Sequence, residues 1–509
     1  MKEWYGFMDV YISGVGMTKF GRSKDPLEKM MAEAASSALK EAQLERVDAI
    51  YMGVMNVEEF VGDSNFAALL ADTLGLTGIP STRVETASST GAGAFETALY
   101  AVASGHMKHV LALAGEKMTH LPTAKTTRIL SEVIDRSERR YGATMPALAA
   151  MIAQKYAREF NLSPLKLEDI LAQVAIKNHS NGSLNPYAQF RKVITKEDYL
   201  KSQMVSYPLR LYDCAPITDG ASAIILTSQP TPIKVSGIGH ATDTAAMKHR
   251  ASFTSFNSTK EAAQKAYTMA QLNPSDIQFA EVHDAFTLFE IIGTEDLGFF
   301  PPGEGWKALE EGTTHLRGRL PINPSGGLKA RGHPVGASGL AQLVEIVYQL
   351  RGYAGKERQL ERAEIGLAQS IGGLGNNNFV TILERSDRKR IMKVGTTRFR
   401  EGWRPDYHPE IKVLKKTNSP PVQEGVGILE TFTTLYATPE GFRSPLTLGF
   451  VETEAGEMVM ACNPDYRSPK ALKMGKKVYL KTREGLYVFE KFTLWNRLKH
   501  WLKGPSKSS

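Results

Sequence analysis

Four residues of the sequence can carry nucleophilic or acid–base chemistry and stand in patterns typical of such sites. Ser88 and His333 each precede a glycine by three residues at the expected start of a helix. A helix start offers unpaired N–H groups and positive potential, which suit a developing oxyanion. A serine before a helix, read alone, is most often only an N-cap. Its pairing with a histidine in a matching segment favours a catalytic site.

The other two residues, His283 and Ser370, follow predicted strands, where catalytic groups of α/β proteins commonly lie. An imidazole can hold a carbonyl oxygen and titrates near neutral pH, although a His-Asp pair read alone is more often structural. Ser370 opens a glycine turn. The amides of Gly372 and Gly373 in that turn are candidates for an anion-binding nest.

An internal repeat must position these residues. Segment 10–16 recurs as 233–239, and each copy is a short strand that ends in a glycine turn. An Ala-rich helix with small residues on one face follows each copy, at 33–44 and at 261–272. The glycines of the first copy lack the spacing and the acidic partner of a nicotinamide site. Two similar halves usually enclose a site between them, so we expect the two helix starts to be equivalent and to converge.

The repeat and the charge pattern divide the chain. Alternating strands and helices predict an α/β fold, with one half at 1–117 and 206–230 and the other at 231–387. Segment 118–205 has no counterpart and is expected to be a helical insertion. Segment 388–509 holds 23 Lys and Arg against 12 Asp and Glu, whereas the rest holds 39 against 42. The basic charge therefore belongs to a separate C-terminal domain.

Bulk properties exclude several classes of protein. No apolar run reaches the roughly 18 residues of a membrane span, and no signal segment is apparent, so integral membrane association is not expected and a cytoplasmic location is. Two cysteines, Cys214 and Cys462, cannot form a four-thiolate zinc site, and we expect no metal.

Six motifs, in this order along the chain, resemble the thiolase superfamily, specifically its sterol-carrier-protein-2-thiolase-like branch. They lie at 84–91, 177–190, 218–223, 281–286, 323–327 and 332–339, and the resemblance covers about residues 10 to 384. It implies a duplicated five-layer α-β-α-β-α fold, a homodimer or higher homo-oligomer, and acyl-coenzyme A substrates with no tightly bound cofactor. Within it, Asn323, Ser325, Gly326 and Gly327 are assigned to coenzyme A binding.

The sequence departs from that family at its thiols. The family's acylated cysteine corresponds to Ser88, and the two positions used for its second cysteine correspond to Ala285 and Ser370. His333 matches the histidine that activates the nucleophile. A serine hydroxyl is far less acidic than a thiol, so ordinary thiolytic cleavage is not expected.

The histidines and glycine-turn amides remain able to stabilise an enolate of a CoA thioester. We therefore predict aldol or retro-aldol chemistry on a β-hydroxyacyl-CoA, as in the cysteine-lacking steroid side-chain aldolases that the family includes. Two alternatives stay open: an acetyl-CoA acetyltransferase in which Ser88 is acylated, and a non-catalytic CoA-binding subunit. Retention of both histidines disfavours the last. The general base of the aldol step is unassigned, with Tyr141, Tyr187 and Tyr212 in motif-bearing segments.

The C-terminal domain is expected to be a β-barrel. Segments 426–436, 446–452, 458–461 and 477–480 are predicted strands, and they resemble the OB-fold domain often encoded beside thiolase-like proteins. Residues 388–425 hold no cysteine, so the zinc ribbon of that family is not expected. The aromatic residues alternate in strand register, which favours a core and a docking role over nucleic-acid binding. Segment 495–503 is a basic amphipathic stretch expected to pack on the body of the protein.

Overall fold

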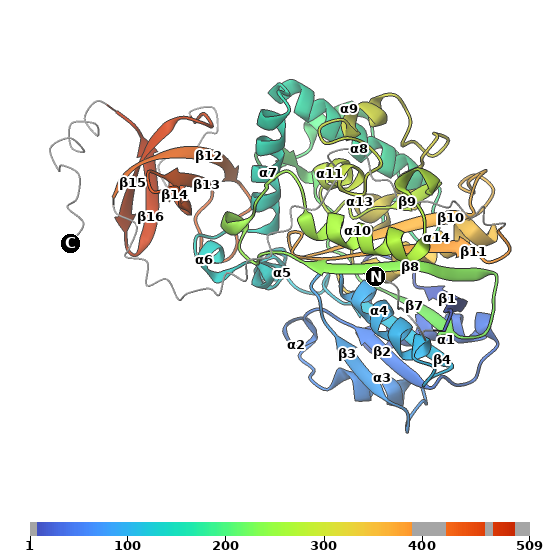
Figure 1. Cartoon of the computed structure of the whole chain (residues 1–509). Helices are drawn as coiled ribbons and strands as arrows, with labels where there is room; N and C mark the ends of the chain where they lie inside the picture. Colours follow the sequence, from blue (N-terminus) through green and yellow to red (C-terminus); the bar gives the residue numbers. More distant parts are fainter. Residues whose placement is uncertain (1–7, 389–423, 464–471, 494–509) are drawn as a thin grey trace.

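The computed structural model describes residues 8–388, 424–463 and 472–493, which form an α/β body (8–388) and a C-terminal barrel (Figure 1). The first half of the body has seven main elements. These are β1 (Tyr11–Met17), α1 (Leu27–Ala42), β2 (Ala49–Gly53), β3 (Ser81–Val84), α4 (Thr90–Ala103), β4 (His109–Glu116) and β7 (Gly220–Thr227). Short helices α2 (Val57–Phe60) and α3 (Phe66–Thr73) lie between β2 and β3.

The second half repeats this order without a counterpart of β3. Its elements are β8 (Ile233–Thr242), α10 (Asn257–Ala270), β9 (Phe279–Glu281), α11 (Thr287–Asp296), α12 (Gly305–Glu310), α13 (Gly327–Arg331), α14 (Ser338–Arg351), β10 (Ile365–Gly372) and β11 (Asn377–Arg385). The strand order is β3-β2-β4-β7-β1 followed by β8-β11-β10-β9, and the pair Tyr11 and Lys234 joins the halves. Matching orders confirm the predicted duplication.

Glycines explain why each first strand lies against its helix. A Cβ atom at Gly14 would lie 2.1 Å from the carbonyl oxygen of Ala38, and one at Gly239 would lie 2.0 Å from that of Ala262. Only glycine allows this approach of strand to helix backbone. The predicted small-residue helix faces are therefore confirmed in both halves. Gly14 and Gly16 of β1 serve this packing.

Helices cover both faces of the sheet. α1 packs on the outer face of the first half, and α10 packs on that of the second. α4 and α14 pack on each other between the halves, in an apolar cluster that includes Phe95, Leu99, Leu340 and Val344. The N-terminal ends of α4 and α14 are thereby brought together. Among the described residues, no helix is both long and apolar enough to cross a membrane.

The segment between β4 and β7 is mainly helical. It contains α5 (Thr123–Leu130), α6 (Arg136–Arg139), α7 (Met145–Glu159), α8 (Pro164–Ser183), α9 (Lys196–Lys201), β5 (Met204–Ser206) and β6 (Leu209–Arg210). The hydroxyls of Thr144 and Ser163 cap α7 and α8, and a proline follows each cap within two residues. Both features are typical helix starts.

Five strands close the C-terminal barrel: β12 (Gly425–Leu435), β13 (Leu446–Thr453), β14 (Met458–Asn463), β15 (Lys477–Arg483) and β16 (Leu486–Lys491). The pairing runs β12-β13-β14-β16-β15 and returns to β12, with β14 and β16 parallel. The four predicted strands are confirmed, and β16 was not predicted. The amphipathic segment 495–503 lies outside the described residues.

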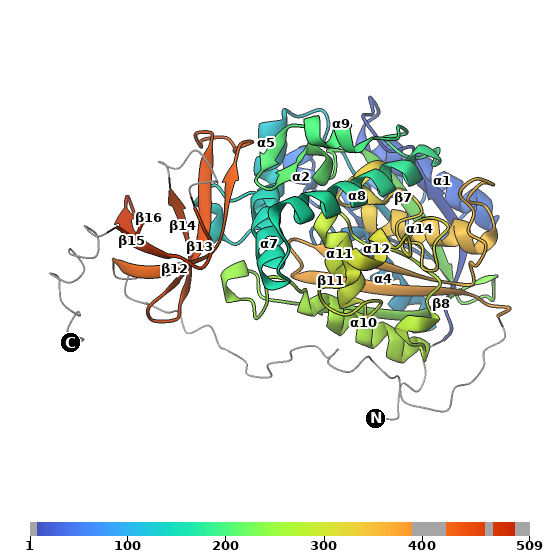
Figure 2. The same cartoon turned by 90° about the horizontal axis from the view of Figure 1, so that it is seen from above.

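The barrel lies at one end of the molecule beside α7, as Figures 1 and 2 both show. The Thr431 hydroxyl donates to the carbonyl oxygen of Met151 at 2.8 Å, and the Tyr487 amide donates to the Tyr141 hydroxyl at 3.1 Å. Barrel residues such as Leu448 and Phe450 share an apolar cluster with α7. The barrel is thus anchored to the helical segment that also reaches the candidate site.

Candidate active site

A cavity of about 160 Å³ lies between the starts of α4 and α14 and the loop after β9. Ser88, His283, His333 and Gly373 all line it, so the structure brings together residues far apart in the sequence. Most of the remaining wall is apolar, with Met55, Leu130, Val133, Met145, Phe286 and Phe289. An apolar lining of this kind strengthens electrostatic interactions inside the cavity.

The expected equivalence of Ser88 and His333 is wrong by three residues. A Cβ at Gly91 would lie 2.9 Å from the amide nitrogen of Leu340, and one at Gly339 would lie 2.7 Å from that of Ala92. Gly91 and Gly339 are therefore the matched pair, each the second residue of its helix. Ser88 then corresponds to Gly336, because the second half has a longer folded turn ahead of its helix.

That turn carries His333 back over the start of α14. The His333 amide donates to the Thr218 hydroxyl at 2.9 Å, and the amides of Ala337 and Ser338 both donate to the carbonyl oxygen of Pro334. The Ser338 hydroxyl donates to the same Pro334 oxygen at 2.9 Å and lies 2.7 Å from Nδ1 of His333. Since that hydroxyl proton is already used, Nδ1–H of His333 is the donor. Nε2 of His333 therefore keeps a free lone pair.

His283 has the opposite tautomer. The Ile371 amide donates to Nδ1 of His283 at 3.2 Å, so Nδ1 is unprotonated. A neutral imidazole then carries its proton on Nε2. Among the described residues, no group accepts a hydrogen bond from this Nε2–H, and His283 lines the cavity. The cavity therefore receives a donor from His283 and an acceptor from His333.

Burial keeps both rings neutral. It lowers the pKa of His283 well below its usual value, and the nearby His333 and Arg331 add to the effect. Burial, together with Arg331, also lowers the pKa of His333 to about 3. The ring centroids lie 5.2 Å apart with the planes nearly perpendicular, at 89°. At neutral pH the pair can thus accept a proton at one atom and stabilise an oxyanion at the other.

Ser88 stands on a strained segment without a base. Ala87 before it has φ of 55°, a left-handed conformation that is uncommon for alanine. The Ser89 hydroxyl donates to carbonyl oxygens of Thr86 and Asn377, whereas the Ser88 hydroxyl makes no hydrogen bond with any described residue. A serine nucleophile is normally within hydrogen-bond reach of its base.

The glycine turn after β10 contributes unevenly. Gly373 lines the cavity, and its amide donates to no acceptor among the described residues. Gly372 is enclosed, since a Cβ there would lie 2.4 Å from the carbonyl oxygen of Thr86. Ser370 is buried with an unpaired hydroxyl and lies outside the cavity wall. Of this predicted group, only Gly373 offers a donor at the cavity.

The residues assigned to coenzyme A binding form buried structural contacts. Asn323 accepts from the Val282 amide at 2.8 Å and donates to Glu290, and Ser325 donates to Glu281 at 2.6 Å. Gly326 and Gly327 pack closely against Gly182 and Asp284. None of the four lines the cavity. Their contacts fix the loop that carries His283.

The amide of Gly336, in the turn before α14, already has a hydrogen-bond acceptor. Glu116, at the end of β4, accepts from the amides of Met55 at 2.9 Å and Gly336 at 3.1 Å. Burial raises the pKa of Glu116 to about 8. This carboxyl group links the two halves and occupies the Gly336 amide.

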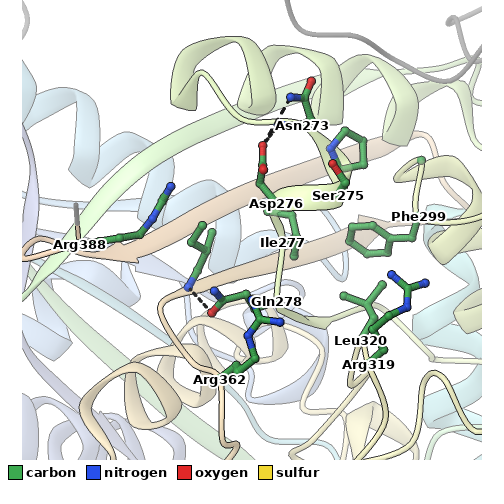
Figure 3. A pocket seen from close by; sticks show the side chains of 13 residues that line it. Asn273, Ser275, Asp276, Ile277, Gln278, Phe299, Arg319, Leu320, Arg362 and Arg388 are labelled. Atoms are coloured by element: carbon green, nitrogen blue, oxygen red, sulfur yellow. Dashed lines mark hydrogen bonds between the residues drawn. The ribbon is translucent and has the colours of Figure 1, made fainter. Parts of the chain in front are cut away.

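Two further pockets differ from this cavity. A surface depression of about 650 Å³ adjoins it through Val133. Three arginines and two carboxylates line the depression: Arg128, Arg136, Arg139, Glu132 and Asp135. Another pocket, of about 540 Å³, lies at the amino end of β9 beside Gln278, with Arg319, Arg362 and Arg388 around it (Figure 3). His283 follows the opposite, carboxyl end of β9. The pocket in Figure 3 is therefore separate from the candidate active site.

The described residues contain no cluster of three metal-ligating side chains.

Cys214 is a cavity residue that the sequence did not single out. It lines the cavity beside Ala215, Ala285 and Phe286. The only available signal was its place four residues before the Thr218 motif.

Family models match most of the body: "Thiolase, N-terminal domain" over residues 10–230 and "Thiolase C-terminal domain-like" over 239–385. The chain is 43% identical over 387 residues to an acetyl-CoA acetyltransferase of Methanothermobacter thermautotrophicus, covering 74% of this chain and 100% of that protein.

Two solved structures share the fold. A monomeric SCP2-thiolase like protein type 1 from Mycobacterium smegmatis matches with a TM-score of 0.70 and 15% identity, covering 95% of this chain and 99% of that chain. A structure titled Ltp2-ChsH2(DUF35) aldolase matches with a TM-score of 0.64 and 24% identity, covering 75% and 99%. At these identities the likeness shows the fold alone.

Proposed function

We propose, because this chain belongs to the thiolase family, that it makes or breaks a carbon–carbon bond of an acyl-CoA thioester without a cysteine nucleophile. Aldol or retro-aldol chemistry on a β-hydroxyacyl-CoA is the reaction that the site supports best. One observation carries this proposal. His333 and His283 present a base nitrogen and a donor N–H to one cavity, in which Ser88 has no base beside it.

The two imidazoles supply what a retro-aldol step needs. Nε2 of His333 takes the proton of the β-hydroxyl, the electrons of that O–H bond form a carbonyl group, and the Cα–Cβ bond breaks. The electron pair moves into the thioester as an enolate, whose oxygen accepts from Nε2–H of His283 and from the amide of Gly373. A donor of this kind typically contributes a factor of about 10² to 10³ in rate. In the aldol direction the same groups act in reverse.

The arginine-lined depression suits the phosphates of coenzyme A. Arg136 and Arg139 make no ion pair with a described residue, although Arg128 pairs with Glu59 and Glu132. Guanidinium groups bind phosphates by charge-assisted hydrogen bonds. We therefore place the nucleotide end of the substrate over α6 and the acyl end in the cavity beyond Val133, and we assign positioning to Asn323, Ser325, Gly326 and Gly327.

The barrel has the strand order of an OB-fold, 1-2-3-5-4 closed onto strand 1, with strands 3 and 5 parallel. We propose an OB-fold domain for residues 388–509. We also propose that the body has five layers and consists of one half at 1–117 and 206–230, a second half at 231–387, and an insertion at 118–205. Contacts of the barrel with α7, whose first residues Met145 and Pro146 line the cavity, support a role in holding the acyl pocket. Assembly into a homo-oligomer remains a prediction.

A second candidate is an acetyltransferase in which Ser88 is acylated, and the 43% identity to a protein of that name favours it. The absence of a described hydrogen bond from the Ser88 hydroxyl to an imidazole disfavours it.

One experiment separates the two candidates. Wild-type protein is incubated with a panel of 3-hydroxyacyl-CoA thioesters, and the released aldehyde or ketone and shorter acyl-CoA are followed. In parallel, protein treated with acetyl-CoA is digested and the Ser88 peptide is examined by mass spectrometry. Cleavage with an unmodified peptide supports our proposal. An acetylated Ser88 peptide and acyl transfer without cleavage would replace it by the second candidate.

A further inference from the structure

Cys214 lies beside the position at which the family resemblance places a second thiol. Its segment runs antiparallel to the loop that carries His283, with a β-bridge between Cys214 and Phe286. The Ala215 amide donates to the carbonyl oxygen of Ala285 at 2.8 Å. Ala285 occupies the thiol position within the His-Asp motif. A thiol absent from one loop is therefore present on the segment that pairs with that loop.

This thiol shares the cavity with the two imidazoles. Cys214, His283 and His333 are the ionisable side chains that line the cavity among the described residues. His283 is only 2% exposed, and its Nε2–H has no described partner. A donor without a described partner, on a buried ring that lines an apolar cavity, marks the place of a ligand oxygen. Cys214 thus borders the space where the substrate carbon next to that oxygen would lie.

The thiol is suited to give a proton. Its Sγ lies 3.6 Å from the carbonyl oxygen of Arg210, toward which the S–H can point at rest. Burial raises the pKa of Cys214 to about 12, so the group is protonated at neutral pH. An enolate carbon is basic enough to take a proton from such a thiol. Ser370, the other candidate from the sequence, lies off the cavity wall.

We propose that Cys214 is the catalytic acid that protonates the enolate carbon after carbon–carbon cleavage, a role that rests on the function proposed above. The enolate Cα takes the proton of the Cys214 S–H, and the enolate electrons form the new C–H bond. The resulting thiolate takes the proton that His333 removed from the β-hydroxyl. Both residues return to their starting states, and no other reactant is needed. In the reverse direction Nε2 of His333 first takes the proton of the Cys214 S–H, and the resulting thiolate then removes an α-proton from the acyl-CoA.

The test follows α-proton exchange apart from carbon–carbon cleavage. Wild-type, Cys214→Ala, Cys214→Ser and Cys462→Ala proteins are incubated with propanoyl-CoA in deuterium oxide, and deuterium uptake at the α-carbon is measured by mass spectrometry. Cys462 lies in the barrel and is the matched control. We expect both Cys214 variants to lose on the order of 100-fold in exchange rate, and Cys462→Ala to match wild type. The serine variant keeps the volume of the side chain but not its acidity, so it separates chemistry from packing.

The outcomes distinguish this role from the proposed function. If wild type cleaves 3-hydroxyacyl-CoA and exchanges α-protons while Cys214→Ser does both at the wild-type rate, the cysteine has no chemical role. If wild type neither cleaves nor exchanges, the proposed function fails as well.

Discussion

The inner helices of the two halves, α4 and α14, begin with the same glycine packing but with different side chains at the site. In each half a glycine at the second helical position lets α4 and α14 approach until their backbones touch. Ser88 lies two residues before the first residue of α4, whereas a longer turn folds His333 back over the start of α14. Duplication therefore fixes where the site lies, and the length of the turn before each helix decides which side chain reaches it.

The halves also contribute unequally to the site. His283, His333 and Gly373 all come from the second half, whereas the first half supplies Ser88, Cys214 and the linking carboxyl of Glu116. A serine in place of a thiol weakens the contribution of the first half only. Cleavage to the enolate needs a base and an oxyanion donor, which the second half provides by itself. The variants below test that asymmetry.

His333→Ala should have the largest effect. Removal of the base nitrogen should lower kcat/KM for 3-hydroxyacyl-CoA cleavage by about 10³-fold, within the usual range for a general base. Exposed His315, which lies outside the cavity, provides a control variant, His315→Ala, that should keep wild-type activity. Steady-state kinetics would decide the matter. A His333→Ala protein within threefold of wild type would exclude His333 as the general base.

Glu116→Gln should change how stability depends on pH. The pKa of Glu116 is about 8 in the folded protein and about 4.5 as a free side chain. Between these values the folded state keeps a proton that the unfolded state has released, so stability present at low pH is lost as pH rises through 8. Urea unfolding at pH 5 and pH 9 should show wild type losing at least about 1 kcal/mol more than Glu116→Gln. Exposed Glu311, as Glu311→Gln, is the control, and its pH dependence should match wild type. Equal pH dependence in Glu116→Gln would contradict this account.

Gly91→Ala should disturb both halves at once. The added Cβ would lie 2.7 Å from the carbonyl oxygen of Gly336 and 2.9 Å from the Leu340 amide nitrogen, both of them backbone atoms. We expect the free energy of unfolding to fall by about 1 to 3 kcal/mol, as in other overpacked cores. Thermal or urea unfolding measures this, with Ser104→Ala at the exposed end of α4 as the control. Unchanged stability would mean that the helix contact is not tight.

The sequence patterns predicted the helices and strands better than they predicted the contacts between these elements. Glycine and alanine spacing identified β1 with α1 and β8 with α10, because local packing leaves a periodic signal. The register of Ser88 against His333 depends on turn geometry, and the approach of Cys214 to Ala285 depends on contact between two loops distant in sequence, so neither leaves such a signal. β16 follows a hairpin turn at Glu484 and Gly485, both with positive φ. Glu-Gly is not among the usual hairpin dipeptides such as Asn-Gly and Asp-Gly, so this strand has no clear signal in the sequence.

Ser88→Ala should have the smallest effect and is the sharpest test of the asymmetry. If the first half no longer supplies a nucleophile, loss of this hydroxyl should leave cleavage within about threefold of wild type, because no described group hydrogen-bonds to it. Ser88→Cys restores a thiol at the same place, and a thiol is far more acidic than a hydroxyl. With the lone pair of His333 in the same cavity, we expect this variant to become acetylated by acetyl-CoA, as mass spectrometry of the peptide would show. Ser88→Ala tests for a serine acyl-enzyme, because loss of cleavage in it would require one. Ser88→Cys tests the base, since a thiol that stays unmodified would place the base nitrogen of His333 out of its reach.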